Sequence, residues 1–229
     1  MKSYTYLMVD VACIIVPFLF SFYKKHAFYK EWKHFIPANL LVAAFFLVWD
    51  YWFTEIGVWG FNPDYLCGIY LGNLPLEEVL FFICIPYACT FTYFALKYLV
   101  PLRYYACNSG LVISLLLVPL IFSLFLGYGK MYTFSTSLLL SGVFLVAIYR
   151  QTNLNLILLS YLVVLPFFLL SNGLLTGSFI DEPIVWYDNN ENLGVRVFTI
   201  PVEDFFYGLL LVIGNVTLFE WLKRSRVNS

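Results

Sequence analysis

NLPLEEVLFF, residues Asn73 to Phe82, places two neighbouring carboxyl groups, Glu77 and Glu78, at the head of a strongly apolar run. Proline suits the first turn of a helix because its missing N–H has no intrahelical partner there, and acidic side chains stabilise the positive end of the helix dipole. The stretch therefore predicts the start of a long apolar helix. One acid is enough to cap such a helix, so the second acid indicates a further role.

The whole chain has the composition of an integral membrane protein. Of its 229 residues, 62% are hydrophobic and 12% are charged. A soluble domain of this size has too little interior to bury that much apolar surface. We therefore predict an all-α integral membrane protein with a single membrane domain over residues 1–229. The net charge of −1 gives no indication of a nucleic-acid partner.

Seven apolar segments are long enough to cross the hydrocarbon core, which takes about 20 helical residues. They are Tyr4–Phe22, Phe35–Phe53, Leu74–Leu96, Gly110–Gly127, Tyr132–Tyr149, Leu154–Leu175 and Ile200–Leu222. The first segment is interpreted as a retained anchor helix and not as a signal peptide, because its positive cluster follows the apolar run.

The positive charges are divided unevenly between the two ends of these segments. On one side lie Lys24, Lys25, Lys30, Lys33, Lys97, Arg103, Arg150, Lys223, Arg224 and Arg226, and on the other lie Lys2, Lys130 and Arg196. The positive-inside rule then predicts a multi-pass protein of the cell (inner) membrane, with an exoplasmic N-terminus and a cytoplasmic C-terminus.

The quoted motif recurs near the other end of the chain. GIYLGNLPLEE, residues 68–78, corresponds to GVRVFTIPVED, residues 194–204, with the glycine, the proline and both acids at the same spacing. We therefore predict two parallel three-helix repeats, residues 1–98 and 130–229, joined by a linker helix within residues 99–129. In this arrangement both motifs lie on the same side of the membrane, around one cavity.

The four motif acids are the candidate catalytic residues: Glu77, Glu78, Glu203 and Asp204. Charged residues inside apolar segments are candidates for function. Adjacent residues point about 100° apart on a helix, so one acid of each pair is able to face the interior while the other bonds a neighbouring helix or loop. Four clustered carboxyl groups are not expected to be ionised all at once, which favours paired acid and base chemistry.

Supporting residues are expected near the same helix ends. Asp50 ends the second segment and has a counterpart in Asn172 at the end of the sixth, and each is either a partner of a motif acid or an interfacial polar residue. Aromatic candidates are Trp49, Trp59, Trp186, Phe81 and Tyr207. They are typical of an interfacial aromatic belt, and some are suited to stabilising a carbocation. The Asn62-Pro63-Asp64 stretch is typical of a turn.

Other chemistries lack their motifs. The sequence contains no Gly-rich phosphate loop, no dinucleotide-binding pattern, no zinc pattern and no nucleophile elbow. Its cysteines are interpreted as small buried hydrophobes, and His26 and His34 as solvated interfacial side chains. The five cysteines are Cys13, Cys67, Cys84, Cys89 and Cys107. These observations favour an apolar substrate and no metal.

The two P-x-E-[E/D] motifs, Pro75-Leu-Glu77-Glu78 and Pro201-Val-Glu203-Asp204, together with FTEIGVWGFNPDYLCGIYLGNLPLEEVLFF (53–82), resemble the small membrane-embedded lycopene cyclases of carotenoid synthesis. The likeness covers nearly the whole chain, and in that family the two halves occur fused or as separate chains. The resemblance implies a lycopene β-cyclase. Such an enzyme is an isomerase (intramolecular lyase) that closes the acyclic ψ ends of lycopene, or of a related acyclic carotenoid, into β-ionone rings.

The resemblance also implies a mechanism, no metal and no cofactor. A neutral carboxyl protonates the terminal alkene, the neighbouring double bond attacks the cation, and a carboxylate removes a ring proton. By position in both repeats, Glu77 and Glu203 are expected to transfer protons, and Glu78 and Asp204 to orient them or to act as the partner base. Implied partners are the lipid bilayer and other enzymes of carotenoid synthesis.

Two other classes of protein fit parts of the sequence. A membrane transporter or proton-coupled carrier built from two repeats also suits paired acids in a membrane, but the chain lacks the polar or glycine-interrupted segments that line an aqueous path. A retinal protein is disfavoured because no lysine lies inside the seventh segment, with Lys223 at its end.

Overall fold

The fold is a bundle of long apolar helices. The computed structural model describes residues 2–101, 117, 120–121 and 123–227. Within these residues, six helices are long and apolar enough to cross a membrane. They are α1 (Thr5–Phe20), α2 (Trp32–Glu55), α3 (Leu76–Leu99), α5 (Met131–Tyr149), α6 (Leu154–Leu175) and α7 (Val202–Val227). The predicted Gly110–Gly127 segment falls largely outside the described residues, as do Arg103 and Cys107.

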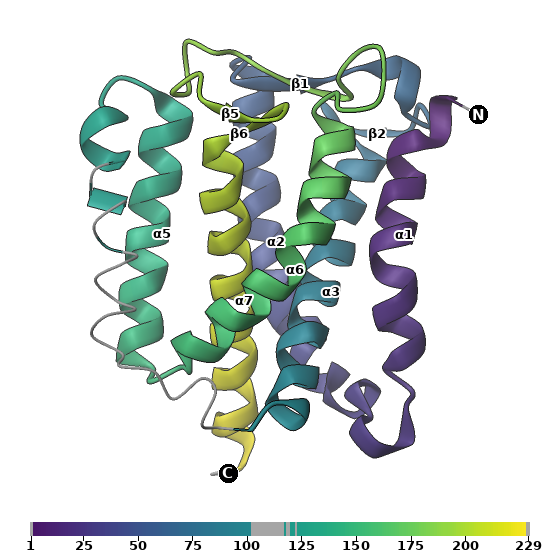
Figure 1. Ribbon diagram of the computed structural model, residues 1–229, viewed down its shortest axis with the longest axis vertical. Coiled ribbons are helices and arrows are strands. Elements are labelled where there is room, and N and C mark those ends of the chain that lie inside the picture. The colour runs from purple at the N-terminus through teal and green to yellow at the C-terminus, as the bar shows by residue number, and fades with distance from the viewer. Residues whose placement is uncertain (1, 102–116, 118–119, 122, 228–229) are drawn as a thin grey trace.

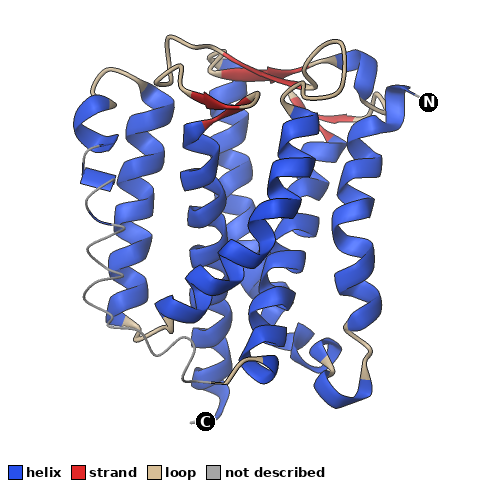
Figure 2. Cartoon of the chain, viewed as in Figure 1, coloured by secondary structure: helices blue, strands red, loops and turns tan. Residues whose placement is uncertain are grey.

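The two ends of the bundle differ in structure. Figure 1 shows the N-terminus at the end where α3 and α7 begin, which we call the motif end, and the C-terminus at the opposite end, which we call the basic end. At the motif end, strand β1 (Trp59–Phe61) pairs antiparallel with β4 (Val185–Tyr187) (Figure 2). This ribbon joins the first half of the chain to the second.

Each acidic motif follows a short hairpin at the motif end. Strand β2 (Tyr70–Leu71) pairs with β3 (Leu74–Pro75), and β5 (Arg196–Val197) pairs with β6 (Ile200–Pro201). The helices α3 and α7 therefore begin two residues later than the predicted segments, because the first two residues of each segment belong to a strand. Short 3-10 helices complete the loops: η1 (Lys2–Tyr4), η2 (Lys24–His26), η3 (Phe28–Glu31) and η4 (Pro63–Tyr65).

Pro86 lies inside α3 and is accommodated by a polar contact from α2. Proline has no N–H, so the carbonyl of Phe82 loses its usual partner four residues further along the helix. The side-chain amide of Asn39 donates to this carbonyl at 3.1 Å. It also donates to Asn215 of α7 at 3.2 Å. This network links three helices in the middle of the bundle.

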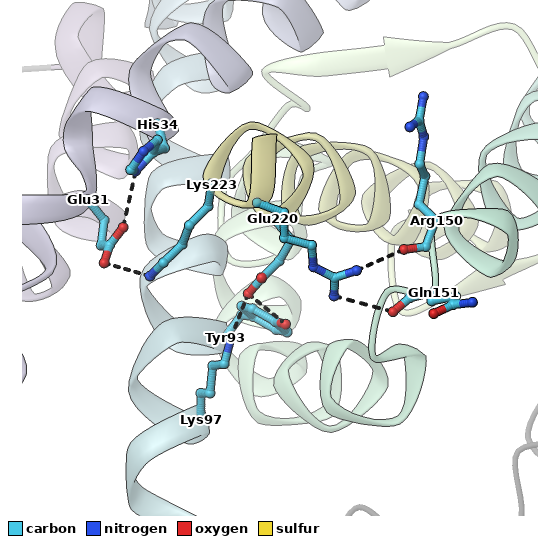
Figure 3. Close-up of polar contacts among 9 residues, drawn as sticks. Glu31, His34, Tyr93, Lys97, Arg150, Gln151, Glu220 and Lys223 are labelled. Atoms are coloured by element: carbon cyan, nitrogen blue, oxygen red, sulfur yellow. Dashed lines mark hydrogen bonds and ion pairs between the residues drawn. The ribbon is translucent and has the colours of Figure 1, made fainter. Parts of the chain in front are cut away.

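At the basic end, ion pairs and hydrogen bonds hold α7 to its neighbours (Figure 3). The Lys223 ammonium donates to Glu31 at 2.6 Å, and Glu31 also contacts the ring of His34 at 3.3 Å. Lys97 donates to Glu220 at 2.9 Å. His34 is therefore buried, contrary to the predicted solvated side chain, because Glu31 holds its ring against the protein.

Candidate functional site

A cavity of about 70 Å³ lies near the motif end of the bundle. Three carboxyl groups line it, one each from α2, α3 and α7: Asp50, Glu78 and Asp204. Most of the remaining lining is aromatic or aliphatic, and it comes from the helices and from the β1–β4 ribbon: Tyr6, Trp59, Phe61, Phe81, Ile85, Tyr132, Phe168, Asn172, Leu175, Val185, Tyr187, Tyr207, Gly208 and Leu211. The cavity therefore combines acidic groups with an apolar wall.

Glu78 is buried beneath the first hairpin. Its Oε2 atom accepts a hydrogen bond from the Tyr6 hydroxyl of α1 at 2.6 Å. The residue is only 8% exposed, although it lies in the first turn of its helix. Within the part of the chain that the structure describes, Tyr6 is thus the one donor that orients Glu78 at the cavity wall.

Asp204 is the carboxyl group with the most hydrogen-bond donors at the cavity. It accepts from Tyr132 at 2.6 Å, from Asn172 at 2.7 Å and from Tyr187 at 3.0 Å. Burial, and then the nearby Asp204 carboxyl, raise the pKa of the Tyr187 phenol in β4 well above its usual value. Tyr187 therefore keeps its proton and acts as a donor to Asp204.

Asp50 completes the set from the end of α2. The indole N–H of Trp59 donates to Oδ1 of Asp50 at 2.5 Å. The other oxygen, Oδ2, is buried and has no hydrogen-bond partner among the residues that the structure describes. Because a buried unpaired carboxyl oxygen is unfavourable, Asp50 is a candidate for a group that contacts substrate.

Glu77 and Glu203 do not line the cavity. Glu77 accepts from the backbone N–H of Cys67 at 2.6 Å, and Glu203 accepts from the backbone N–H of Leu193 at 2.8 Å and from the Thr133 hydroxyl at 2.6 Å. In each motif the first acid accepts a hydrogen bond from the loop that precedes the hairpin, and this bond holds the loop to the helix. Of the four motif acids, Glu78 and Asp204 are therefore the two that lie at the cavity.

The contacts of the two motifs correspond at a constant sequence offset. The Tyr6 hydroxyl donates to Glu78, and the Tyr132 hydroxyl donates to Asp204. The two tyrosines are 126 positions apart in the sequence, and so are the two acids. The backbone N–H of residue 67 donates to residue 77, and that of residue 193 donates to residue 203, which is the same offset of 126 residues. The likeness between the motifs therefore extends to their surroundings in space.

The other predicted site residues divide into two groups. Asn172, Trp59, Phe81 and Tyr207 line the cavity, and Trp49 packs behind it, with its ring centroid 5.2 Å from that of Tyr207.

Trp186 lies outside the cavity and is 45% exposed. The register of the ribbon pairs Trp59 with Tyr187, so Tyr187, and not Trp186, is the β4 residue beside Asp204. At the exposed turn, Asn62 accepts from the backbone N–H of Asp64, which pairs with Lys2 at 3.6 Å.

Several site residues were missed in the sequence. Tyr6, Tyr132 and Tyr187 donate to the cavity carboxyls, and aligning the repeats at the offset of 126 residues would have paired the first two. Asp10 of α1 is fully buried, and no described residue forms a hydrogen bond with either of its carboxyl oxygens. The sequence feature that could have indicated Asp10 is the presence of an acid inside the first apolar segment.

The fold and the site define a class of protein: a membrane-embedded helical protein with carboxyl groups gathered around a small, mainly apolar cavity. A family model described as lycopene cyclase matches residues 3–96 and 129–222. The chain therefore belongs to the lycopene cyclase family, which confirms the resemblance carried by the two motifs. Searches of curated proteins and of solved structures returned no match. Membership implies an enzyme of carotenoid cyclisation with a carotenoid substrate.

Proposed function

We propose that the chain is a lycopene β-cyclase that closes the acyclic ψ ends of lycopene, or of a related acyclic carotenoid, into β-ionone rings. The observation that carries the proposal is the meeting of Asp50, Glu78 and Asp204 at one cavity in a member of the lycopene cyclase family. We further propose that residues 1–98 and 130–229 are repeats of one unit, joined by a linker helix within residues 99–129. The constant offset of the two sets of contacts supports this.

Glu78 is proposed as the general acid. In the described ranges it has one hydrogen-bond donor, Tyr6, whereas Asp204 has three, and donors to a carboxylate favour its ionised form. The neutral Glu78 carboxyl gives its proton to the terminal alkene, and the positive charge forms on the adjacent tertiary carbon. The neighbouring double bond then attacks this carbon, which closes the ring and moves the charge into it.

Asp204 is proposed as the general base. Its carboxylate removes a ring proton, the electrons of that C–H bond form the ring double bond, and the charge is discharged. Return of this proton to Glu78 restores the starting state, so the reaction is an isomerisation without net redox change. The rings of Trp59, Phe81 and Tyr207 at the cavity are suited to stabilising the intermediate cation.

The proposed position in the membrane follows from the charges. The structure has Lys24, Lys97, Arg150 and Lys223 near the basic end, and Lys2 at the motif end. The positive-inside rule supports a cytoplasmic basic end and an exoplasmic motif end in a cell membrane. The bilayer then supplies the apolar substrate, which other enzymes of carotenoid synthesis release into it. No specific observation favours the transporter or carrier alternative.

A panel of isosteric substitutions tests the assignment. In cells that accumulate lycopene, we expect Glu78→Gln and Asp204→Asn to lower the yield of cyclic carotenoid by at least about 100-fold, because each removes a proton-transferring group. Glu77→Gln and Glu203→Gln, the matched controls, are expected to retain cyclisation at a lower yield, since their loss loosens a loop. Pigment chromatography, normalised to the membrane content of each variant, gives the result. Full activity of Glu78→Gln would exclude it as the acid.

A further inference from the structure

The cavity is too small for the proposed substrate as the structure stands. Its volume is about 70 Å³, whereas pockets for small organic ligands enclose about 300–1,000 Å³. If the proposed function is right, some wall of the cavity has to move when the end of a polyene enters. An apolar polyene dissolves in the hydrocarbon of the bilayer, so the moving wall is expected to face lipid.

Among the helices that line the cavity, α1 and α6 face outward most. In an apolar stretch of 18 residues within each helix, only 17% of the residues of α1 and 22% of those of α6 are buried in the protein. The corresponding shares are 44% for α3 and 56% for α7. Both helices lie on the outside of the bundle in Figure 1. α1 supplies Tyr6 to the cavity wall, and α6 supplies Phe168 and Leu175.

The remaining walls are fixed by stronger contacts. The paired strands β1 and β4 cover the motif end of the cavity. On the side of α2, Trp49 packs against Phe53 with ring centroids 5.5 Å apart, and Phe53 packs against Trp59 at 4.8 Å. Aromatic contacts of this kind stabilise a packed core beyond the area they bury.

α1 and α6 are each anchored to a different neighbour. The Tyr6 hydroxyl ties α1 to α3 through Glu78. On α6, the Tyr161 hydroxyl donates to the backbone carbonyl of Phe205 in α7 at 2.7 Å. Between α1 and α6, Tyr6 and Val9 share a buried apolar cluster with Leu175, and Cys13 packs against this cluster. The Cys13 thiol also interacts with Ser171, whose hydroxyl donates to its own helix at 2.9 Å. A thiol contact of this kind is weak compared with those anchors.

We propose that the polyene enters the cavity from the lipid through the seam between α1 and α6, at the level of Cys13 and Ser171. Separation of these two helices breaks the thiol contact and the apolar packing of Tyr6 and Val9 against Leu175, and it leaves the hydrogen bonds of the Tyr6 and Tyr161 hydroxyls intact. The acyclic end then lies against the carboxyl groups while the rest of the chain extends through the seam into the bilayer.

A reversible covalent closure of the seam tests this proposal. Ser171→Cys places a second thiol beside the native Cys13, and oxidation joins the two helices at their present separation. We expect the disulfide-linked fraction to lose cyclisation at least about tenfold, and a reducing agent to restore it. Cys13→Ala combined with Ser171→Cys cannot form this bond and is expected to stay active under oxidation.

A control disulfide at another place distinguishes a block of substrate entry from a general effect of oxidation on activity. The hydroxyls of Ser123 and Ser137 contact each other away from the seam, so the double cysteine variant at these positions is expected to remain active after oxidation. Full turnover by the fraction linked at residues 13 and 171, quantified by mass spectrometry, would overturn the proposal.

A bulky substitution gives a second measurement that does not depend on disulfide formation. Ser171→Trp fills the seam and is expected to lower turnover by a similar factor, and unchanged turnover would also count against the seam. Wild-type protein in the same assay reports on the proposed function separately. If the wild type forms no cyclic product, the proposed function has failed. If the wild type is active and the disulfide-linked variant is equally active, only the proposed entry route is refuted.

Discussion

Asp10 shows how a single residue departs from the ordinary rules of a protein interior. Its side chain is fully buried in α1, and both carboxyl oxygens lack a hydrogen-bond partner in the described part of the chain. A buried polar group without a partner destabilises a protein by about 1–3 kcal/mol. The residue lies one helical turn after Tyr6, on the face of α1 that bonds Glu78. An acid kept in such a place is typical of a functional site in a membrane protein.

Replacing Asp10 with leucine should stabilise the fold. We expect Asp10→Leu to raise the free energy of unfolding by about 1–3 kcal/mol, because the variant removes an unpaired buried carboxyl and fills its space with apolar atoms. Thermal unfolding of the purified protein in detergent measures the change. Thr136, 126 residues further along, is also buried with an unpartnered hydroxyl, so Thr136→Val is the matched control and should have a smaller effect of the same sign. A lower melting temperature for Asp10→Leu would show that the carboxyl has a stabilising partner.

At this scale the sequence identified the acids but not their orientation. The paired motifs marked Glu77, Glu78, Glu203 and Asp204 because charged residues are rare in apolar segments. Which acid of each pair reaches the cavity depends on the loop amides of residues 67 and 193, which bind the first acid of each pair. These amides come from backbone of no distinctive sequence, so the motif alone could not reveal the choice.

At the scale of the elements, α3 depends on a contact from another helix. Pro86 leaves the carbonyl of Phe82 without a helical donor, and Asn39 of α2 supplies one. The apolar pattern of the sequence located both helices to within a few residues. The bond between them was not predictable, because it joins positions 43 residues apart through a side chain with no local signature.

A double-mutant cycle tests this contact. Asn39→Leu is expected to lower the free energy of unfolding by about 1–3 kcal/mol, since it leaves buried polar groups of Phe82 and Asn215 unpaired. In a Pro86→Ala background the new backbone N–H pairs with the Phe82 carbonyl, so the same Asn39 substitution should cost about 1 kcal/mol less. Chemical unfolding of the four proteins gives the coupling. Equal effects of Asn39→Leu in both backgrounds would mean that Asn39 does not compensate for the proline.

At the scale of the whole molecule, the cavity belongs to both halves of the chain. Glu78 comes from the first half and Asp204 from the second, and the β1–β4 ribbon crosses between the halves directly over the site. The duplicated motif predicted that the acids share one side of the bundle. It could not predict the ribbon, because pairing of Trp59 with Tyr187 depends on a register set by long-range packing.

The shared cavity gives a physical basis for the unequal roles proposed for Glu78 and Asp204. Among the described residues, Glu78 has one hydrogen-bond donor and Asp204 has three, one of which is the side-chain amide of Asn172. Such differences give two neighbouring carboxyl groups different affinities for a proton. One half is thereby suited to giving a proton and the other to receiving one.

Isotope transfer in a single turnover tests the central claim, that a side-chain carboxyl lends a proton to a polyene and a second carboxyl takes one back. Protein equilibrated in D₂O carries deuterium on its carboxyl groups and is mixed with a smaller amount of lycopene. Mass spectrometry of the product should show one deuterium for each ring closed, and Glu78→Gln should form no ring. Cyclic product that contains no deuterium, or equal ring formation by Glu78→Gln, would contradict the account.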